Sequence, residues 1–316
     1  MENVMEDQEL KPEVPETTPT APETEKKKSK IPTKLIWDIV VTVALSLGAV
    51  IMLLPFLWMV LGTFRTGASI ETSFFPQAGD WSGKAYPDMW KESNKIMNSD
   101  WAVIRAILNS LLTTVPVVVV QILVSAFAAF AFAKLNFVGK NIMFLVLLST
   151  MMVPFAVVML PQVWWFDQLN LLEGPIAVII PKFFGSITTV FFLRQFLYGI
   201  PDSISEAARL DGASYTRTFI SVILPLLMPA LATQAILSFI GNWNDFLGPL
   251  LYIQGNEWYT LPLLVNFVNN KGGSKGVLAV PQTLAISLIS LVPIIIIFAV
   301  FQKKIIGSIV FSAVKG

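Results

Sequence analysis

The chain has 316 residues, of which 54% are hydrophobic and 14% are charged. Soluble domains carry about 25% charged residues, so this composition indicates an integral membrane protein. The net charge of +1 says nothing about nucleic acid, but no dense basic patch with interleaved aromatics occurs, so no nucleic-acid partner is expected. Cysteine and histidine do not occur, which excludes disulfides, thiol chemistry and the commonest general base and metal ligand. We therefore expect an all-α, multi-pass membrane protein with no catalytic residue, metal site or cofactor of its own.

Residues 1–34 differ from the rest of the chain in composition. Prolines recur among Thr and Glu, and almost nothing in the segment is apolar. The segment is acidic up to Glu25 and then basic from Lys26 to Lys34. This pattern predicts a disordered tail whose basic end anchors the first membrane helix on the cytoplasmic side.

Six apolar stretches follow, each near the ~20 residues that cross a bilayer. They cover 36–63, 106–132, 142–161, 175–193, 219–241 and 282–301. Pro181 and Lys182 interrupt the fourth. Most of the 22 Lys and Arg residues fall on the side of the N-terminus, so both termini are expected in the cytoplasm.

The segments expected on the outer side are 65–105, 161–173 and 255–281, the last with a Gly-rich tip at 271–276. The first two carry tryptophans. At membrane edges such residues usually anchor the protein in the interface, although their rings can also stack on sugars.

The longest polar stretch on the inner side is Ser203–Pro225. Ser203 and Glu206 have the spacing of a capping box, which predicts a helix start. Gly212 tolerates a positive φ and predicts the end of that helix. Ser214 is placed to cap the next one. The two alanines, Ala207 and Ala208, leave a surface of little bulk that another protein can approach closely.

Glu206-Ala207-Ala208, Gly212 and the string Val222-x-Leu224-Pro225 resemble the EAA motif of ABC-importer permeases, EAA-x3-G-x9-I-x-L-P, with Val in place of Ile. The resemblance extends over Ile36–Gly316 and narrows to the carbohydrate-uptake permeases of the maltose-transporter kind. The strings that extend it are Phe192–Phe196, Gly241–Phe246, Tyr259–Leu263, the last span ending at Gln302, and Ala313–Gly316.

The resemblance implies that residues 35–316 form a six-helix permease domain in the plasma membrane of a prokaryote, with the MetI-like fold. It implies four kinds of partner beside membrane lipid: a second homologous permease, two ATPase subunits that bind ATP, an extracytoplasmic solute-binding protein, and a sugar. The motif would be the coupling helix, about residues 203–212, that docks on the ATPase. Its expected coupling residues are Glu206, Ala207, Ala208, Asp211 and Gly212.

The solute pathway is less defined. Polar residues on the spans are candidates for it, although in membrane helices they more often bond a neighbouring helix. These candidates are Asn109, Ser110, Asn242 and Asn244. Lys182 is the one charge inside a span; it either extends toward the lipid headgroups or faces the cavity and meets an anionic or strongly hydrogen-bonding sugar.

Two other functions stay open. An ATP-independent secondary carrier or channel would normally keep carboxylates near the midplane, and no Asp or Glu falls within the six stretches. A membrane protein with a purely structural or assembly role would have no need of the coupling motif.

The expected topology can be tested with reporters. Reporters placed near Asn136 and after Lys315 should read cytoplasmic, and one near Gly273 external. An external reading near Arg209 would contradict the coupling assignment, because an ATPase could not reach the motif there.

Overall fold

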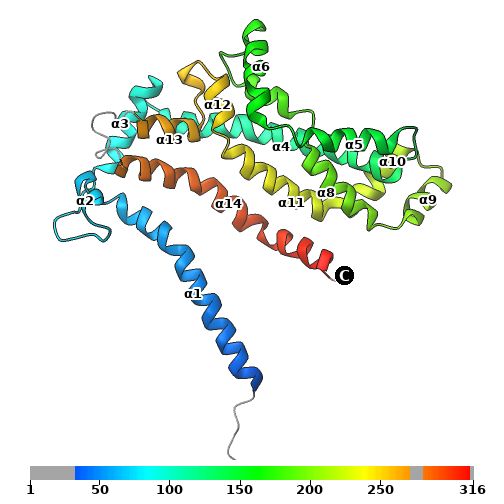
Figure 1. Cartoon of the computed structure of the whole chain (residues 1–316), viewed down its shortest axis with the longest axis horizontal. Helices are drawn as coiled ribbons and strands as arrows, with labels where there is room; N and C mark the ends of the chain where they lie inside the picture. Colours follow the sequence, from blue (N-terminus) through cyan, green and yellow to red (C-terminus); the bar gives the residue numbers. More distant parts are fainter. Residues whose placement is uncertain (1–32, 271–279, 314–316) are drawn as a thin grey trace, which may run out of the picture. The chain divides into compact units, whose positions relative to one another are not determined.

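The computed structural model describes residues 33–270 and 280–313. These residues are almost entirely helical; an isolated antiparallel bridge joins Arg65 to Trp81. The α-helices are α1 (Thr33–Gly62), α2 (Gly67–Thr72), α3 (Ala85–Met97), α4 (Ala102–Lys134), α5 (Lys140–Thr150), α6 (Phe155–Gln168), α7 (Ile176–Ile179), α8 (Ile187–Tyr198), α9 (Asp202–Leu210), α10 (Tyr215–Thr218), α11 (Leu224–Trp243), α12 (Leu247–Tyr252), α13 (Leu261–Asn270) and α14 (Val280–Ala313) (Figure 1).

The chain divides into two units. Residues up to Leu53, which include the first part of α1, form one unit, and Leu54–Gly316 form the other. Thr33 and Lys34, which the sequence assigned to the tail, already belong to α1. The rest of the expected disordered tail, the Gly-rich tip at 271–276 and the end of the chain from Val314 lie outside the described residues.

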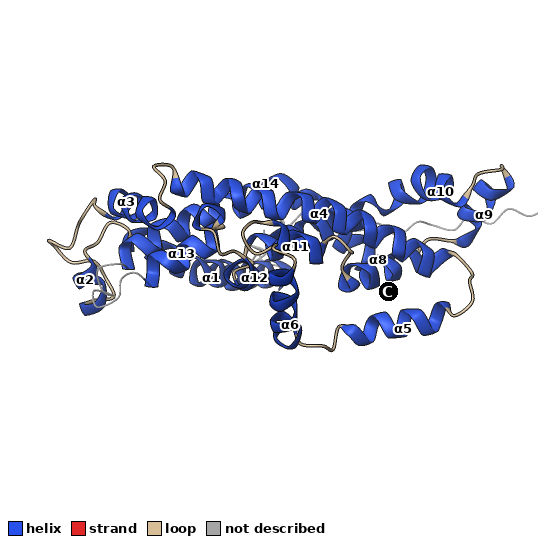
Figure 2. Ribbon diagram, turned by 90° about the horizontal axis from the view of Figure 1, so that it is seen from above, coloured by secondary structure: helices blue, strands red, loops and turns tan. Residues whose placement is uncertain are grey.

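Five helical stretches in the described residues are long and apolar enough to cross a membrane. They cover Trp37–Gly62, Ala102–Lys134, Ile176–Tyr198, Tyr215–Trp243 and Val280–Gln302. The expected third span, 142–161, is not one straight helix: α5 and α6 meet at an angle of 89° (Figure 2). Six crossings result if this bent pair is counted as one span, which agrees with the expected fold class.

The bend has a local cause in the sequence. Pro154 is extended, with φ −62° and ψ 134°, and precedes the first residue of α6. A residue before proline is pushed out of the helical region, so the helix that ends at Thr150 cannot run through Val153. Because α6 then continues to Gln168, the outer loop expected from Pro161 starts later than the sequence indicated.

The centre of the larger unit is α4, which packs against α8, α11 and α13. Small residues on α4, among them Ala126 and Ala129, have no exposed surface, which allows the helices to approach closely. The ring of Phe219 fills the space beside them, with centroids 4.4 Å from Phe127 and 5.1 Å from Phe130. Packing on α4 therefore holds α8 and α11 together.

Two further spans are irregular. The fourth span changes to a 3-10 turn at Ile180–Lys182 and resumes as α8 after Gly185, whose φ is +92°. The fifth begins with a π-helical segment, Phe219–Ile223, which the sequence analysis did not predict. Pro225 follows this segment and has no backbone N–H to donate to the carbonyl four residues earlier.

A buried arginine organises the segment after α1. The Arg65 side chain donates hydrogen bonds to the Ser69, Ser73 and Phe74 carbonyls at 2.7, 2.8 and 3.2 Å. Its Nη2 lies 3.5 Å from Asp80 Oδ2, and its side chain is 1% exposed. Arg65 thus fixes a segment that the sequence analysis treated as a loop between two spans.

Arg65→Met should loosen this segment, because several carbonyls lose their charged donor at once, at a cost of about 3 kcal/mol. We expect faster proteolytic cleavage within residues 66–82. Arg105→Met, at an exposed arginine, is the matched control. Equal cleavage rates in the two variants would contradict this role.

Candidate functional site

The expected coupling motif folds as the short helix α9, between α8 and α10 at one end of the unit (Figure 1). No residue of α9 is buried, and Leu210 is 89% exposed. The capping box expected from Ser203 and Glu206 does not form. Pro201 is extended and the helix begins at Asp202, so Ser203 already has a helical backbone and cannot act as the N-cap.

The turn after α9 forms as the sequence predicts. Gly212 has a φ of +83°. Its N–H donates to the Arg209 carbonyl, and the Ala213 N–H to the Ala208 carbonyl, both at 3.0 Å. This is the Schellman arrangement, which closes a helix end with a left-handed residue. The expected cap on α10 also forms, because Ser214 Oγ accepts from the Arg217 N–H at 3.3 Å.

A lysine from another helix holds the start of α9. Lys134, the last residue of α4, donates to the Ile200 carbonyl at 2.5 Å and to Asp202 Oδ1 at 2.6 Å. The Lys134 side chain is 4% exposed, whereas that of Asp202 is 76% exposed. The sequence analysis missed this contact, which joins residues 68 positions apart.

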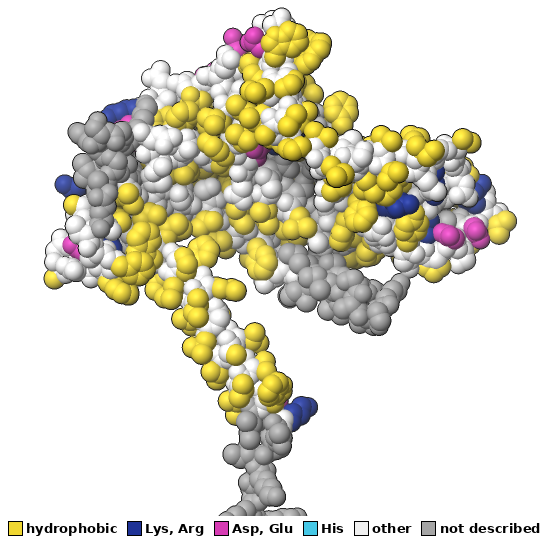
Figure 3. All heavy atoms as spheres, viewed as in Figure 1, with side chains coloured by type: hydrophobic (Ala, Val, Ile, Leu, Met, Phe, Trp, Pro, Cys, Tyr) yellow, Lys and Arg dark blue, Asp and Glu magenta, His cyan; other side chains and the backbone are white. Residues whose placement is uncertain are grey.

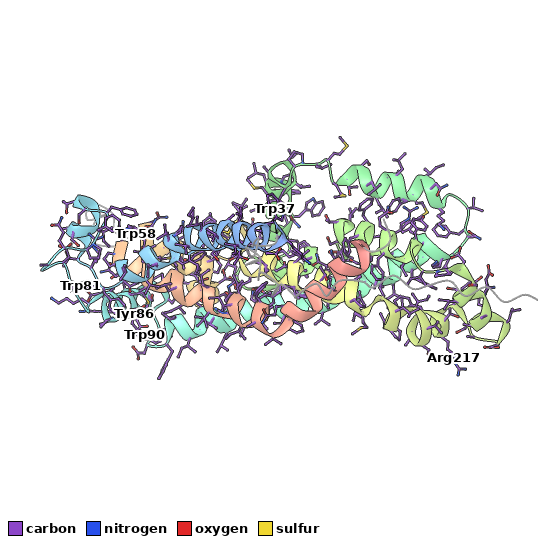
Figure 4. All side chains as sticks on the ribbon, turned by 90° about the horizontal axis from the view of Figure 1, so that it is seen from below. Trp37, Trp58, Trp81, Tyr86, Trp90 and Arg217 are labelled. Atoms are coloured by element: carbon purple, nitrogen blue, oxygen red, sulfur yellow. The ribbon has the colours of Figure 1, made fainter. Side chains whose placement is uncertain are left out.

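The faces of α9 stay accessible. Among the expected coupling residues Ala208 is partly exposed and the rest are exposed: Glu206, Ala207, Asp211 and Gly212. A cleft of about 170 Å³ separates α9 from the end of α4 and includes Glu206 and Thr218. Charged side chains of both signs gather at this end of the molecule (Figure 3). Arg217 lies here, whereas Trp58, Trp81, Tyr86 and Trp90 lie at the opposite end (Figure 4).

Two of the expected pathway residues make bonds within the chain. Asn109 is buried and donates to the carbonyls of Glu257 and Tyr259 at 2.8 and 3.1 Å. Ser110, also buried, accepts from the Leu261 N–H at 2.7 Å. Both residues therefore attach α4 to the segment that leads into α13.

The other two asparagines lie at the end of α11. Asn242 is half-buried and donates to the Ser238 carbonyl at 2.8 Å, and the Ser238 hydroxyl donates to Gln121 on α4. Asn244 is exposed and donates to the Ile240 carbonyl at 3.0 Å. Each asparagine keeps a side-chain oxygen for which no donor is recorded among the described residues.

Lys182 has a partner that the sequence analysis did not identify. Its ammonium lies 2.6 Å from Asp245 Oδ2, with the two side chains 27% and 22% exposed. The pair joins residues 63 positions apart, and Asp245 was noticed only as part of the string Gly241–Phe246. The ammonium is therefore neutralised by a carboxylate of the same chain.

The pair lines a cavity of about 620 Å³ between α6, the 3-10 turn and α12. Tyr252 donates to Gln162 Oε1 at 2.8 Å in the same wall. Burial, aided by the negative charge of Asp245, raises the pKa of Tyr252, so its hydroxyl stays protonated and keeps this bond. The cavity thus combines one ion pair, an amide and several apolar side chains.

Comparison with known proteins identifies the class. The family model described as "Binding-protein-dependent transport system inner membrane component" matches residues 121–307. The chain belongs to this family, which confirms the family that the EAA string indicated. It is therefore a multi-pass membrane subunit of a transporter rather than an enzyme, and membership implies an ATPase and a binding protein as partners.

Individual relatives agree. The chain is 36% identical over 209 residues to the arabinooligosaccharides transport system permease protein AraQ of Halalkalibacterium halodurans, covering 66% of this chain and 73% of the relative. It is 28% identical over 269 residues to the diacetylchitobiose uptake system permease protein NgcG of Streptomyces coelicolor, covering 84% and 85%. In the crystal structure of a bacterial ABC transporter involved in the import of the acidic polysaccharide alginate, one chain matches with a TM-score of 0.60 and 22% identity, over 87% of this chain and 98% of that chain, which shows the shared fold.

Lys134→Met should release the start of α9, because the variant loses a charge-assisted bond and a second bond, together roughly 2 kcal/mol. The chain has no cysteine, so spin labels at Leu210→Cys and Ile142→Cys report the distance from α9 to α5 without background. We expect a broader distance distribution in the Lys134→Met variant. Lys91→Met, an exposed lysine on α3, is the control, and equal widths in both variants would contradict the clamp.

Proposed function

We propose that the chain is the permease half of an ATP-driven importer that moves a sugar or oligosaccharide into the cytoplasm. The observation that carries the proposal is α9, a helix with the EAA string that is fastened at both ends and exposed on its faces. A helix that has no buried residue and contacts its own chain mainly at the segments that follow it, α10 and Phe219–Ile223, yet is held in place, suits a docking element for another subunit.

The substrate class is supported by the relatives. The relatives include permeases named for transport of arabinooligosaccharides, diacetylchitobiose, alpha-glucoside and lactose, all of which are carbohydrates. The assembly we propose contains a second homologous permease, two ATPase subunits and an extracytoplasmic solute-binding protein. Both termini and α9 face the cytoplasm in this arrangement, and ATP is bound by the ATPase subunits.

The contacts of α9 define what this chain does in coupling. A displacement of α9 by the ATPase pulls on Lys134 through Asp202 and the Ile200 carbonyl, and so acts on the end of α4. It also acts on α10 through the turn at Gly212. Because α4 packs against α8, α11 and α13, movement of α9 reaches the central helices of the unit.

We propose that the part of the solute pathway contributed by this subunit includes Lys182, Asn242 and Asn244. Lys182 lines the cavity, and the asparagines lie at the end of the helix that precedes Asp245. Asn109 and Ser110 are left out, because both are buried and bond the backbone of the segment that leads into α13.

Gly212→Asp tests the coupling role. A Cβ at this position meets nothing within 4 Å, so the substitution leaves the packing of the chain intact. It costs about 1 kcal/mol at a positive φ and adds a negative charge to the docking surface. We expect normal membrane insertion, loss of ATPase association and loss of uptake in the assembled importer.

Gly212→Asn is the matched control, since asparagine tolerates the left-handed conformation and adds no charge. It should keep most of the association with the ATPase. Full uptake by Gly212→Asp, or uptake that persists without the ATPase subunits in liposomes, would favour an ATP-independent carrier instead.

A further inference from the structure

The cavity at Lys182 carries an inference about the substrate. The described residues that line it include two charged groups, Lys182 and Asp245, and these neutralise one another at 2.6 Å. From this geometry we infer that the cavity binds a neutral saccharide rather than an acidic one. The inference rests on the proposed function and narrows its substrate class.

The charge balance in the cavity opposes an acidic ligand. An acidic sugar would need the Lys182 ammonium for itself, and would then leave Asp245 unpaired beside a second negative charge. Both the broken pair and the repulsion oppose binding in a partly dehydrated cavity. A neutral sugar neither breaks the ion pair nor adds a negative charge, because its hydroxyls can form hydrogen bonds with the intact pair.

The side chains of Lys182 and Gln162 keep hydrogen-bonding groups that a sugar can use. An ammonium has three N–H donors, and Lys182 uses one of them on Asp245. Gln162 accepts from Tyr252 through Oε1, and no partner is recorded for its amide N–H groups among the described residues. The pair is also exposed enough, at 27% and 22%, for a ligand to touch it. Donors and acceptors therefore stand together in one wall, as vicinal hydroxyls require.

The cavity also offers apolar surface to a sugar ring. Phe155, Trp165 and Pro161 line the same cavity from α6, the helix that also carries Gln162. Sugar rings have apolar C–H faces as well as hydroxyl edges, so they fit a lining that combines aromatic and polar side chains. The volume, about 620 Å³, suits a small ligand.

Gly248 fixes the orientation of the Asp245 carboxylate that pairs with Lys182. The Gly248 N–H donates to Asp245 Oδ1 at 3.1 Å, while Lys182 binds Oδ2. A Cβ at position 248 would lie 2.7 Å from Oδ2. Gly248 thus acts as a positioning residue, since any side chain there would move the carboxylate away from the ammonium.

Saturation-transfer NMR on the full chain in lipid nanodiscs tests the inference without the ATPase or the binding protein. The probes are three neutral trisaccharides, maltotriose, arabinotriose and cellotriose, and the acidic trigalacturonate. The wild-type chain should bind at least one neutral probe, and trigalacturonate, which carries three carboxylates, at least about tenfold more weakly.

Three variants sharpen the test. Asp245→Asn leaves the lysine unpaired and should shift the preference toward trigalacturonate by about tenfold. Asp88→Asn, at an exposed aspartate on α3, should behave like the wild type. The exchanged pair, Lys182→Asp with Asp245→Lys, should restore the neutral preference, which separates charge from misfolding.

Three results would overturn the inference. They are wild-type binding of trigalacturonate as tight as that of the neutral probes, no binding of any neutral probe, and equal preferences in Asp245→Asn and Asp88→Asn. Failure of the proposed coupling would appear differently, as an unaffected importer in the Gly212→Asp experiment with sugar binding intact.

Discussion

The constraint on which the structure depends is that α9 is fastened at both ends while none of its residues is buried. Lys134 binds the first turn from a nearly buried position, and the left-handed Gly212 closes the last one. A nine-residue helix is too short to persist in water without such support. Because both supports act at the ends, the exposed alanines and Glu206 can face another protein.

Helix α4, which carries Lys134 at its last turn, is also held at its first turns. Asn109 and Ser110 attach its first turns to the segment between Glu257 and Leu261, 148 and 151 residues further along the chain. Lys134 attaches its last turn to α9. We infer that α4 is the rigid connection between the coupling helix and the opposite end of the unit, where Trp81 and Trp90 lie (Figure 4). A tilt of α4 would then act on both ends together.

How much the sequence predicted depends on how local each feature is. The turn at Gly212 and the cap at Ser214 involve neighbouring residues, so residue type and spacing sufficed, and the family followed from the same string. The predicted helix start at Ser203 was wrong, because Pro201 is extended and α9 begins at Asp202. The bend of the third span at Pro154 was not predicted, because apolar composition alone does not show where a span changes direction.

The contacts that define the two sites could not be predicted from spacing. Lys134 meets Asp202 across 68 residues, and Lys182 meets Asp245 across 63. Periodicity shows which face of a helix is apolar, but it does not show which helices are neighbours. The sequence could therefore mark Lys182 as unusual without finding the carboxylate that neutralises it.

The claim that α9 is the surface for the ATPase is tested most directly by hydrogen exchange on the purified chain, with and without its ATPase subunits. The account predicts that the amides of residues 202–212 gain the strongest protection on addition of the ATPase. It would be contradicted if these amides were unchanged while another exposed segment became protected.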